Sequence, residues 1–173
     1  MSFIRHLVAP IAMAVITWIV LPSAAAAETK LSDFNGEWRG NGTDRNTPLE
    51  PTQPTTCRMR IQADLRHLNS ETTCIGKAGL HKVLRLAITL DGNQFAGSAS
   101  QSSTVANGAA NALNGTVVGH KADEMASLQV RFAGITPNAT VVLRRLDPST
   151  FTMLITSLGL SLTNVAFDRT ANH

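Results

Sequence analysis

Two cysteines are the side chains of this sequence whose type and spacing most clearly indicate chemistry. Cys57 and Cys74 are the only cysteines among the 173 residues. An even number of cysteines in an oxidising compartment favours a disulfide, and closing a loop of this length stabilises a fold by about 3 kcal/mol in the chain-entropy model. A metal pair or a redox dithiol needs a tighter spacing or further ligands. The two cysteines therefore predict a structural disulfide.

The other reactive side chains form no pattern typical of a catalytic or metal site. The sequence contains no P-loop, no dinucleotide-binding fingerprint, no His-Glu-x-x-His pair and no Gly-x-Ser-x-Gly elbow. Four histidines follow the first 27 residues without metal-ligand spacing: His67, His81, His120 and His173. The carboxylates of Asp123 and Glu124 belong to a predicted turn. Side chains distant in sequence can still meet in space, but these patterns favour a non-enzymatic protein without metal or cofactor.

The first 27 residues predict a cleaved export signal. Arg5 and His6 precede an apolar run over residues 7–21, and the small residues 23–27 offer an Ala-x-Ala cleavage site before Glu28. The apolar run is shorter than the roughly 20 residues of a spanning helix, which favours cleavage over a retained anchor. No cysteine lies at the cleavage site, which argues against a lipoprotein. We therefore expect a periplasmic or secreted protein with no stable membrane span after cleavage.

The charge of the exported part argues against a nucleic-acid partner. The whole sequence has 15 basic and 12 acidic residues and a formal net charge of +3. Cleavage removes Arg5, so the exported part has one positive charge fewer. No run of like charges is present to focus a field on a polyanion or an anionic membrane.

Short alternating runs predict an all-β domain over residues 28–173. Strands are predicted at 57–65, 70–75, 82–90, 94–100, 112–118, 125–132, 140–146, 151–156 and 160–167, after a first strand near 33–42. Asp91-Gly92-Asn93 is typical of a hairpin turn, and turns are also predicted at 66–69, 119–124, 134–138, 147–149 and 157–159. Eight to ten short antiparallel strands indicate a barrel or a sandwich. The up-and-down barrel is preferred because closure removes exposed edges.

The alternation also predicts which side chains point inward. These are Leu84, Leu86, Ile88, Leu128, Val130, Phe132, Met153 and Ile155. Cys57 and Cys74 are expected to face each other across the hairpin of strands 57–65 and 70–75.

Two segments leave alternatives open. Residues 43–55 contain Pro48, Pro51 and Pro54, which lack backbone donors, so the segment is expected to stay outside the sheet as an extended surface loop. At a barrel mouth this loop is either a lid or a solvated connector. Residues 98–111 are small and polar apart from Val105, and they form either a flexible loop or an alanine-lined wall that leaves room inside the barrel.

Residues 33–42 carry a resemblance to a known family. They contain Phe34 and the pattern Gly36-x-Trp38-x-Gly40-x-Gly42, and glycine inside a strand often marks a bend or a close backbone approach. The pattern resembles the first strand of the lipocalin-like (calycin) barrels, and its fuller form is similar to that of nitrobindin-type haem proteins.

The resemblance implies an eight-stranded barrel with an internal cavity, which often holds an apolar ligand. It also implies that Trp38 packs across the closed end of the barrel. Arg169 would then stack on Trp38 or donate a hydrogen bond near it. Nitrobindin-type proteins bind haem through a histidine on a late strand, and residues 160–167 contain none, so we expect no haem.

Two functional hypotheses follow. The first is an exported barrel that binds a small apolar or amphipathic ligand, and this hypothesis requires that the inward side chains leave a cavity. The second is an envelope protein that binds another protein, such as an inhibitor of a protease or lysozyme, and acts through residues 28–32 or 43–55. A purely structural envelope protein would have the same sequence features.

Overall fold

Ten antiparallel strands and one short helix make up the described part of the computed structural model, which covers residues 30–45, 47–76, 79, 81–104, 111–123, 125–134 and 138–170. The elements are η1 (Leu31–Phe34), β1 (Gly36–Asp44), β2 (Gln53–Ala63), β3 (His67–Gly76), β4 (His81–Asp91), β5 (Gln94–Thr104), β6 (Asn111–Ala122), β7 (Met125–Phe132), β8 (Ala139–Asp147), β9 (Thr150–Ser157) and β10 (Leu160–Arg169).

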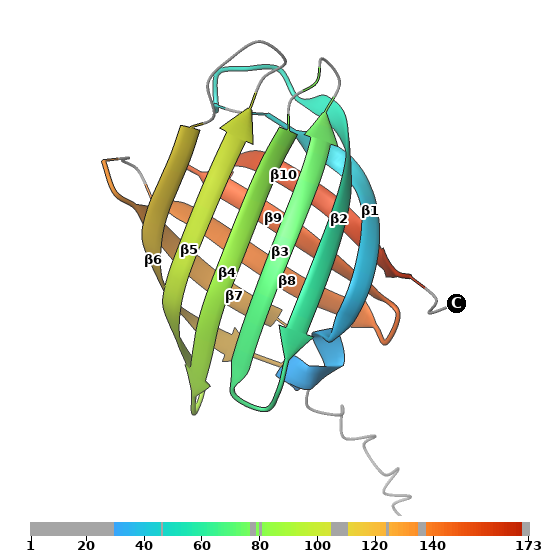
Figure 1. The fold of residues 1–173 in the computed structure, drawn as a ribbon, viewed down its shortest axis with the longest axis vertical. Helices are drawn as coiled ribbons and strands as arrows, with labels where there is room; N and C mark the ends of the chain where they lie inside the picture. The colour runs from blue at the N-terminus through green and yellow to red at the C-terminus, as the bar shows by residue number, and fades with distance from the viewer. Residues whose placement is uncertain are drawn as a thin grey trace, which may run out of the picture.

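The strands form a closed up-and-down barrel. Each strand pairs with its neighbour in sequence, and β10 returns to pair with β1 (Figure 1). The predicted fold class is therefore confirmed, with ten strands. The eight strands implied by the family resemblance are wrong.

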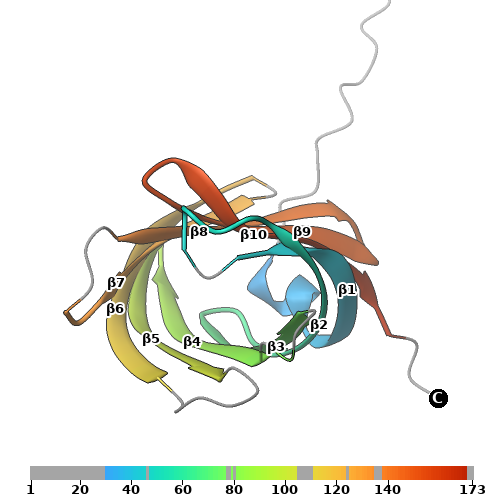
Figure 2. The ribbon, with the colours of Figure 1, turned by 90° about the horizontal axis from the view of Figure 1, so that it is seen from above.

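The two ends of the barrel differ. η1 lies beneath the lumen at one end, which we call the closed end (Figures 1 and 2). β1 and β3 finish at the opposite end, which we call the mouth.

The inward face of the barrel is filled by apolar side chains. Residues alternate between buried and exposed along β2, β4 and β7, as expected for strands with one face in the core. The predicted inward residues are all buried except Ile155, which is partly buried and packs against the core. The largest fully buried side chains are Phe151, Phe167, Ile61, Leu68 and Leu128.

The glycines of β1 lie at the seam where the barrel closes. A Cβ on Gly40 would lie 2.6 Å from the backbone oxygen of Ala166, and one on Gly42 would overlap the backbone oxygen of Asn164. Both clashes involve β10, the strand that pairs with β1. The alternate glycines of the opening motif therefore let the last strand pack closely against the first.

The boundaries of two segments predicted from the sequence need correction. Residues 43–55 do not all lie outside the sheet, because β1 extends to Asp44, β2 begins at Gln53, and Pro54 pairs with Thr43. Proline is tolerated there because Pro54 is exposed and lies next to the end of the strand, where a missing backbone N–H donor does not interrupt the hydrogen bonds of the sheet. β6 extends to Ala122, so most of the predicted turn 119–124 is strand, and the backbone reverses at Asp123, with a φ of 44°.

For residues 98–111, the sequence left a loop and a barrel wall open as alternatives. Residues up to Thr104 belong to β5, and Ala99 is buried in the core. This part is therefore barrel wall. Residues 105–110 lie outside the described residues, as do residues 1–29, which include the predicted export signal, and His173.

Candidate functional site

The residues of the opening motif form a packed plug at the closed end. The Trp38 Nε1 donates a hydrogen bond of 2.9 Å to the Phe34 carbonyl, and the Trp38 ring packs edge-on against Phe151 at 4.8 Å. Phe151 also contacts Phe34 and stacks on Phe167. The Arg169 guanidinium lies 4.6 Å from the centroid of the Trp38 ring. These contacts are structural and leave no exposed aromatic face for a ligand.

The helix η1 is held under this plug by an ion pair. The Arg145 Nη1 lies 2.7 Å from the Asp33 Oδ2. The backbone N–H of Lys30 and the Arg145 guanidinium lower the pKa of Asp33, although partial burial opposes them. The closed end is therefore sealed by apolar packing and a cation–carboxylate contact.

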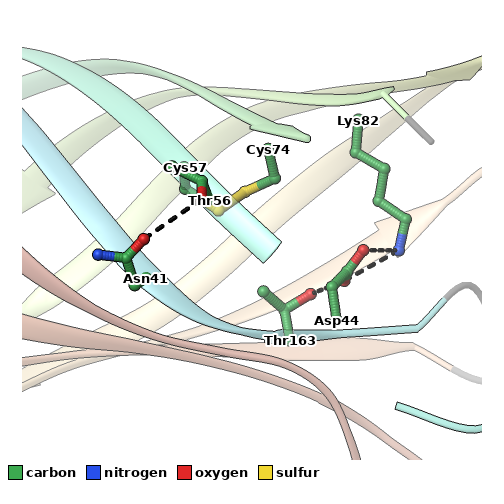
Figure 3. The surroundings of a disulfide bond; sticks show 7 residues. All are labelled: Asn41, Asp44, Thr56, Cys57, Cys74, Lys82 and Thr163. Carbon is green, nitrogen blue, oxygen red and sulfur yellow. Dashed lines mark hydrogen bonds and ion pairs between the residues drawn. A yellow bond between two sulfur atoms is a disulfide. The ribbon is translucent and has the colours of Figure 1, made fainter. Parts of the chain in front are cut away.

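The mouth contains a buried ion pair that spans the lumen. Asp44 at the end of β1 is 2% exposed, and the Lys82 Nζ, from β4, lies 2.8 Å from its Oδ2 and 3.0 Å from its Oδ1. The Thr163 hydroxyl of β10 donates a hydrogen bond of 2.7 Å to the same Oδ1 (Figure 3). Lys82 also donates to the Arg45 carbonyl at 2.8 Å. We call Asp44, Arg45, Lys82 and Thr163 the mouth network.

Lys82 links two strands that are not neighbours in the sheet. β4 is separated from β1 by β2 and β3 in the sheet order, so the Lys82 side chain crosses the lumen to meet Asp44. Its three ammonium donors have three acceptors, two from the carboxylate and one from a carbonyl. The ion pair is thus well satisfied inside a low-dielectric site.

Arg45 holds the proline-containing loop to the rim of the barrel. Its Nε donates to the Ser161 carbonyl at 2.6 Å, and its Nη1 donates to the Pro48 carbonyl at 3.0 Å. The Arg45 backbone N–H donates to the Leu162 carbonyl. Seen from above, the segment between β1 and β2 reaches across the mouth (Figure 2). Of the alternatives that the sequence left open, this arrangement favours a lid.

The three prolines of the candidate mouth loop have different positions. Pro48 is half-buried beneath the Arg45 contact, Pro51 is exposed, and Pro54 belongs to β2. The structure thus brings only Pro48 to the mouth network.

The predicted disulfide is confirmed and forms part of the mouth wall. Cys57 of β2 and Cys74 of β3 are directly opposite each other and are joined by an S–S bond of 2.04 Å (Figure 3). Both residues are buried. Cys74 also pairs with Lys82 across β3 and β4. The covalent link therefore fixes the two strands that lie between Asp44 and Lys82.

A small cavity of about 60 Å³ lies at the mouth. Its polar wall includes Asp44, Lys82 and Thr163, and its apolar wall includes Leu84, Met153, Ile155, Cys74 and Leu162. Pockets for drug-sized ligands measure roughly 300–1,000 Å³, so the cavity has room for the end of a ligand or for about two water molecules. Nearer the rim, the buried Thr55 hydroxyl has no hydrogen-bond partner in the described structure.

The other sequence candidates do not meet. His67, His81 and His120 are exposed on three different strands, and His67 contacts the nearby Asp64 carboxylate. The backbone N–H groups of Arg66 and His67 lower the pKa of Asp64. In the described ranges, no group of three or more His, Cys, Asp or Glu residues is arranged to hold a metal ion. No helix within those ranges is long and apolar enough to cross a membrane.

Sequence reasoning missed the mouth network, although a signal was present. Asp44 lies in phase with the inward positions 38, 40 and 42, and Lys82 lies in phase with Leu84, Leu86 and Ile88. A charged residue at an inward position is costly unless it is paired. Two such residues of opposite charge therefore indicate an internal ion pair.

Comparison with known proteins adds no relative. No protein-family model matches the sequence, and no curated protein matches it significantly. The closed antiparallel barrel is consistent with a calycin-like fold, and the likeness to that family rests on this architecture and on the opening motif.

Proposed function

We propose that this protein is an exported, non-enzymatic binding protein that takes a small apolar or amphipathic ligand at the barrel mouth. The observation that carries the proposal is the mouth cavity, which has an apolar wall on one side and the buried Asp44–Lys82 pair on the other. An amphipathic molecule matches such a cavity, because its apolar end can contact Leu84 and Met153 while its polar end stays near the rim.

The filled lumen limits the size of the ligand. Our first hypothesis required that the inward side chains leave a cavity, and most of the barrel interior is instead packed. The cavity of about 60 Å³ accommodates only a short apolar end. The proposal is therefore restricted to a molecule that binds at the mouth, under the loop that Arg45 holds, and excludes a bulky molecule deep in the barrel.

The charges at the mouth favour an anionic polar end. Asp44 already pairs with Lys82, whereas the Arg45 side chain donates to backbone carbonyls. An anionic head group at the rim would therefore be attracted by the Arg45 guanidinium.

Native mass spectrometry of the exported protein, recovered from a bacterial periplasm, tests the proposal. The same spectrum reports the oxidation state of the cysteines and any molecule that co-purifies. We expect an adduct that is lost on unfolding, and we expect short-chain carboxylates to bind when they are added. An oxidised protein that carries no adduct and binds no member of a short-chain series would contradict the proposal.

A pair of tryptophan variants locates the ligand. Ile155 lines the mouth cavity, whereas the neighbouring Leu154 is in the opposite phase of β9. Ile155→Trp should fill the cavity and abolish binding, and Leu154→Trp should leave binding unchanged. Equal loss of binding in both variants would show that the ligand lies elsewhere.

A second candidate function, binding of a protein partner, is favoured by exposed leucines near the mouth. Leu49, in the loop held by Arg45, is 95% exposed, and Leu158, in the β9–β10 turn, is 70% exposed. Leu158 has a φ of 53°, a conformation that a leucine adopts rarely. A large apolar side chain at this exposed turn is available for contact with another molecule.

The double variant Leu49→Ser/Leu158→Ser tests this second candidate. If the protein slows a secreted protease or lysozyme in a panel of hydrolases, the double variant should lose that effect. The matched variant Leu65→Ser changes an exposed leucine outside the mouth, in the β2–β3 turn, and should retain it. A panel in which no hydrolase is slowed by the wild-type protein counts against the inhibitor role.

A further inference from the structure

Two arginines face each other on the outer surface of the barrel. Arg39 of β1 and Arg58 of β2 are directly opposite in the strand register, and both side chains are exposed. Directly opposed residues have Cβ atoms about 4.5–5.5 Å apart, and like charges at that spacing are destabilising. The register of β1 and β2 therefore brings together two positive charges that lie 19 positions apart in the sequence.

The nearest glutamates do not neutralise this arginine pair. Glu37 pairs with Arg60 through a contact between its Oε1 and the Arg60 Nη2, and Glu71 pairs with Arg85, with 2.7 Å between the Glu71 Oε2 and the Arg85 Nε. The hydrogen bonds that Arg60 donates to the Glu37 carboxylate raise the pKa of Arg60 and so keep that neighbouring guanidinium charged.

Asp168 is the remaining carboxylate beside the arginine pair. It lies opposite Arg39 on β10. No ion pair within 4 Å joins Asp168 to Arg39 or Arg58 in the described residues. The two guanidinium groups thus have donors available for a ligand.

A hollow of about 210 Å³ lies over the arginine pair. Besides Arg39 and Arg58, it is lined by the ion-paired Glu37, Arg60 and Glu71 and by two hydroxyl side chains, Thr73 and Thr170. Thr73 is directly opposite Arg58 in the register of β2 and β3. The hollow therefore combines two unpaired guanidinium groups with hydroxyl donors.

We propose that Arg39 and Arg58 form an anion site for a phosphoryl group on the outer wall of the barrel. Guanidinium groups bind phosphate through two parallel hydrogen bonds each. A carboxylate is satisfied by one such fork, whereas a tetrahedral phosphoryl group offers oxygens to two arginines that approach from neighbouring strands. The phosphoryl group belongs to a small soluble phosphate compound or to a phospholipid head group, which present the same chemistry.

Titration of the exported protein with inorganic pyrophosphate tests the site. Isothermal calorimetry at low salt should detect binding to the wild-type protein. Arg58→Gln should weaken binding by about tenfold, which corresponds to about 1.4 kcal/mol. The matched control is Arg144→Gln, because Arg144 is exposed on β8 and the variant makes the same charge change away from the hollow. Ile155→Trp, which blocks the mouth cavity, should leave pyrophosphate binding unchanged.

A second arm identifies the source of the phosphoryl group. Vesicles of phosphatidylglycerol are compared with vesicles of phosphatidylcholine in a sedimentation assay. Retention on phosphatidylglycerol that Arg58→Gln removes supports the site and assigns it to a lipid head group. Pyrophosphate binding without retention on vesicles supports it and assigns a soluble phosphate. Absence of both interactions, or equal loss in Arg58→Gln and Arg144→Gln, would overturn the proposal.

Discussion

Removal of Lys82 is the sharpest test of the mouth network. The Asp44 side chain is 3% exposed, and its carboxylate contacts the Lys82 ammonium and the Thr163 hydroxyl. Lys82→Met removes the ammonium and leaves a buried carboxylate with one neutral donor. Breaking a buried ion pair from one side costs about 3–5 kcal/mol, a large part of a total stability of roughly 5–15 kcal/mol.

Asp44→Asn and Lys82→Met should lower the free energy of unfolding by different amounts. The Lys82 side chain is 15% exposed, so in Asp44→Asn it can turn toward water while the amide still accepts from Thr163. We expect that variant to cost about 1–3 kcal/mol, the cost of an unsatisfied buried group. The double variant Asp44→Asn/Lys82→Met removes both charges, and it should be less destabilised than Lys82→Met alone.

Urea unfolding of the oxidised protein measures these differences. Trp38 is the only tryptophan beyond the predicted signal, and it is buried in the plug, so its fluorescence reports global unfolding. The free energies of the four proteins complete a double-mutant cycle. If Lys82→Met lowers the free energy of unfolding by less than about 0.5 kcal/mol, the ion pair behaves as an exposed one, and our account of a buried ion pair at the mouth would be refuted.

Three further predictions concern other parts of the barrel. Trp38→Ala should lower the free energy of unfolding by about 3–5 kcal/mol through the cavity it leaves, whereas an unchanged urea midpoint would contradict the plug. The double variant Cys57→Ala/Cys74→Ala should be less stable by about 3 kcal/mol, and equal midpoints of that variant and the oxidised protein would contradict a stabilising role. Hydrogen bonds from Thr150 and Ser149 lower the pKa of Asp147 to about 2. The stabilisation from Asp147 should thus be complete above the ordinary pKa of 3.8 and lost as pH falls through about 2. A carboxyl NMR titration with a midpoint near 3.8 would contradict this.

The sequence alone determined the strands and their inward faces. Alternation with a period of two is a local property, so Leu84, Leu86 and Ile88 are assigned to the core without knowledge of the partner strands. The disulfide followed for a related reason. Cys57 and Cys74 lie on consecutive strands joined by a short turn, and the turn fixes their register.

The proline segment shows where local rules fail. The missing donor of Pro54 suggested that residues 43–55 lie outside the sheet, yet β2 begins at Gln53. A proline disrupts a β-sheet only where its missing backbone N–H would have donated a hydrogen bond. Whether that is so depends on the position of the proline in the folded sheet. The extent of the mouth loop was therefore fixed by strand pairing.

Only the tertiary structure decided which distant residues meet. Asp44 and Lys82 come together because the closed barrel curves from β1 through β2 and β3 to β4, so that the inward-facing Lys82 reaches Asp44. Closure also brings Asn164 and Ala166 against Gly42 and Gly40, which explains the glycines of the opening motif. The Arg39–Arg58 pair depends on the register between β1 and β2. Contacts of this kind depend on the number of strands, their order and their stagger. These are properties of the whole closed sheet, so no single segment of the sequence predicts them.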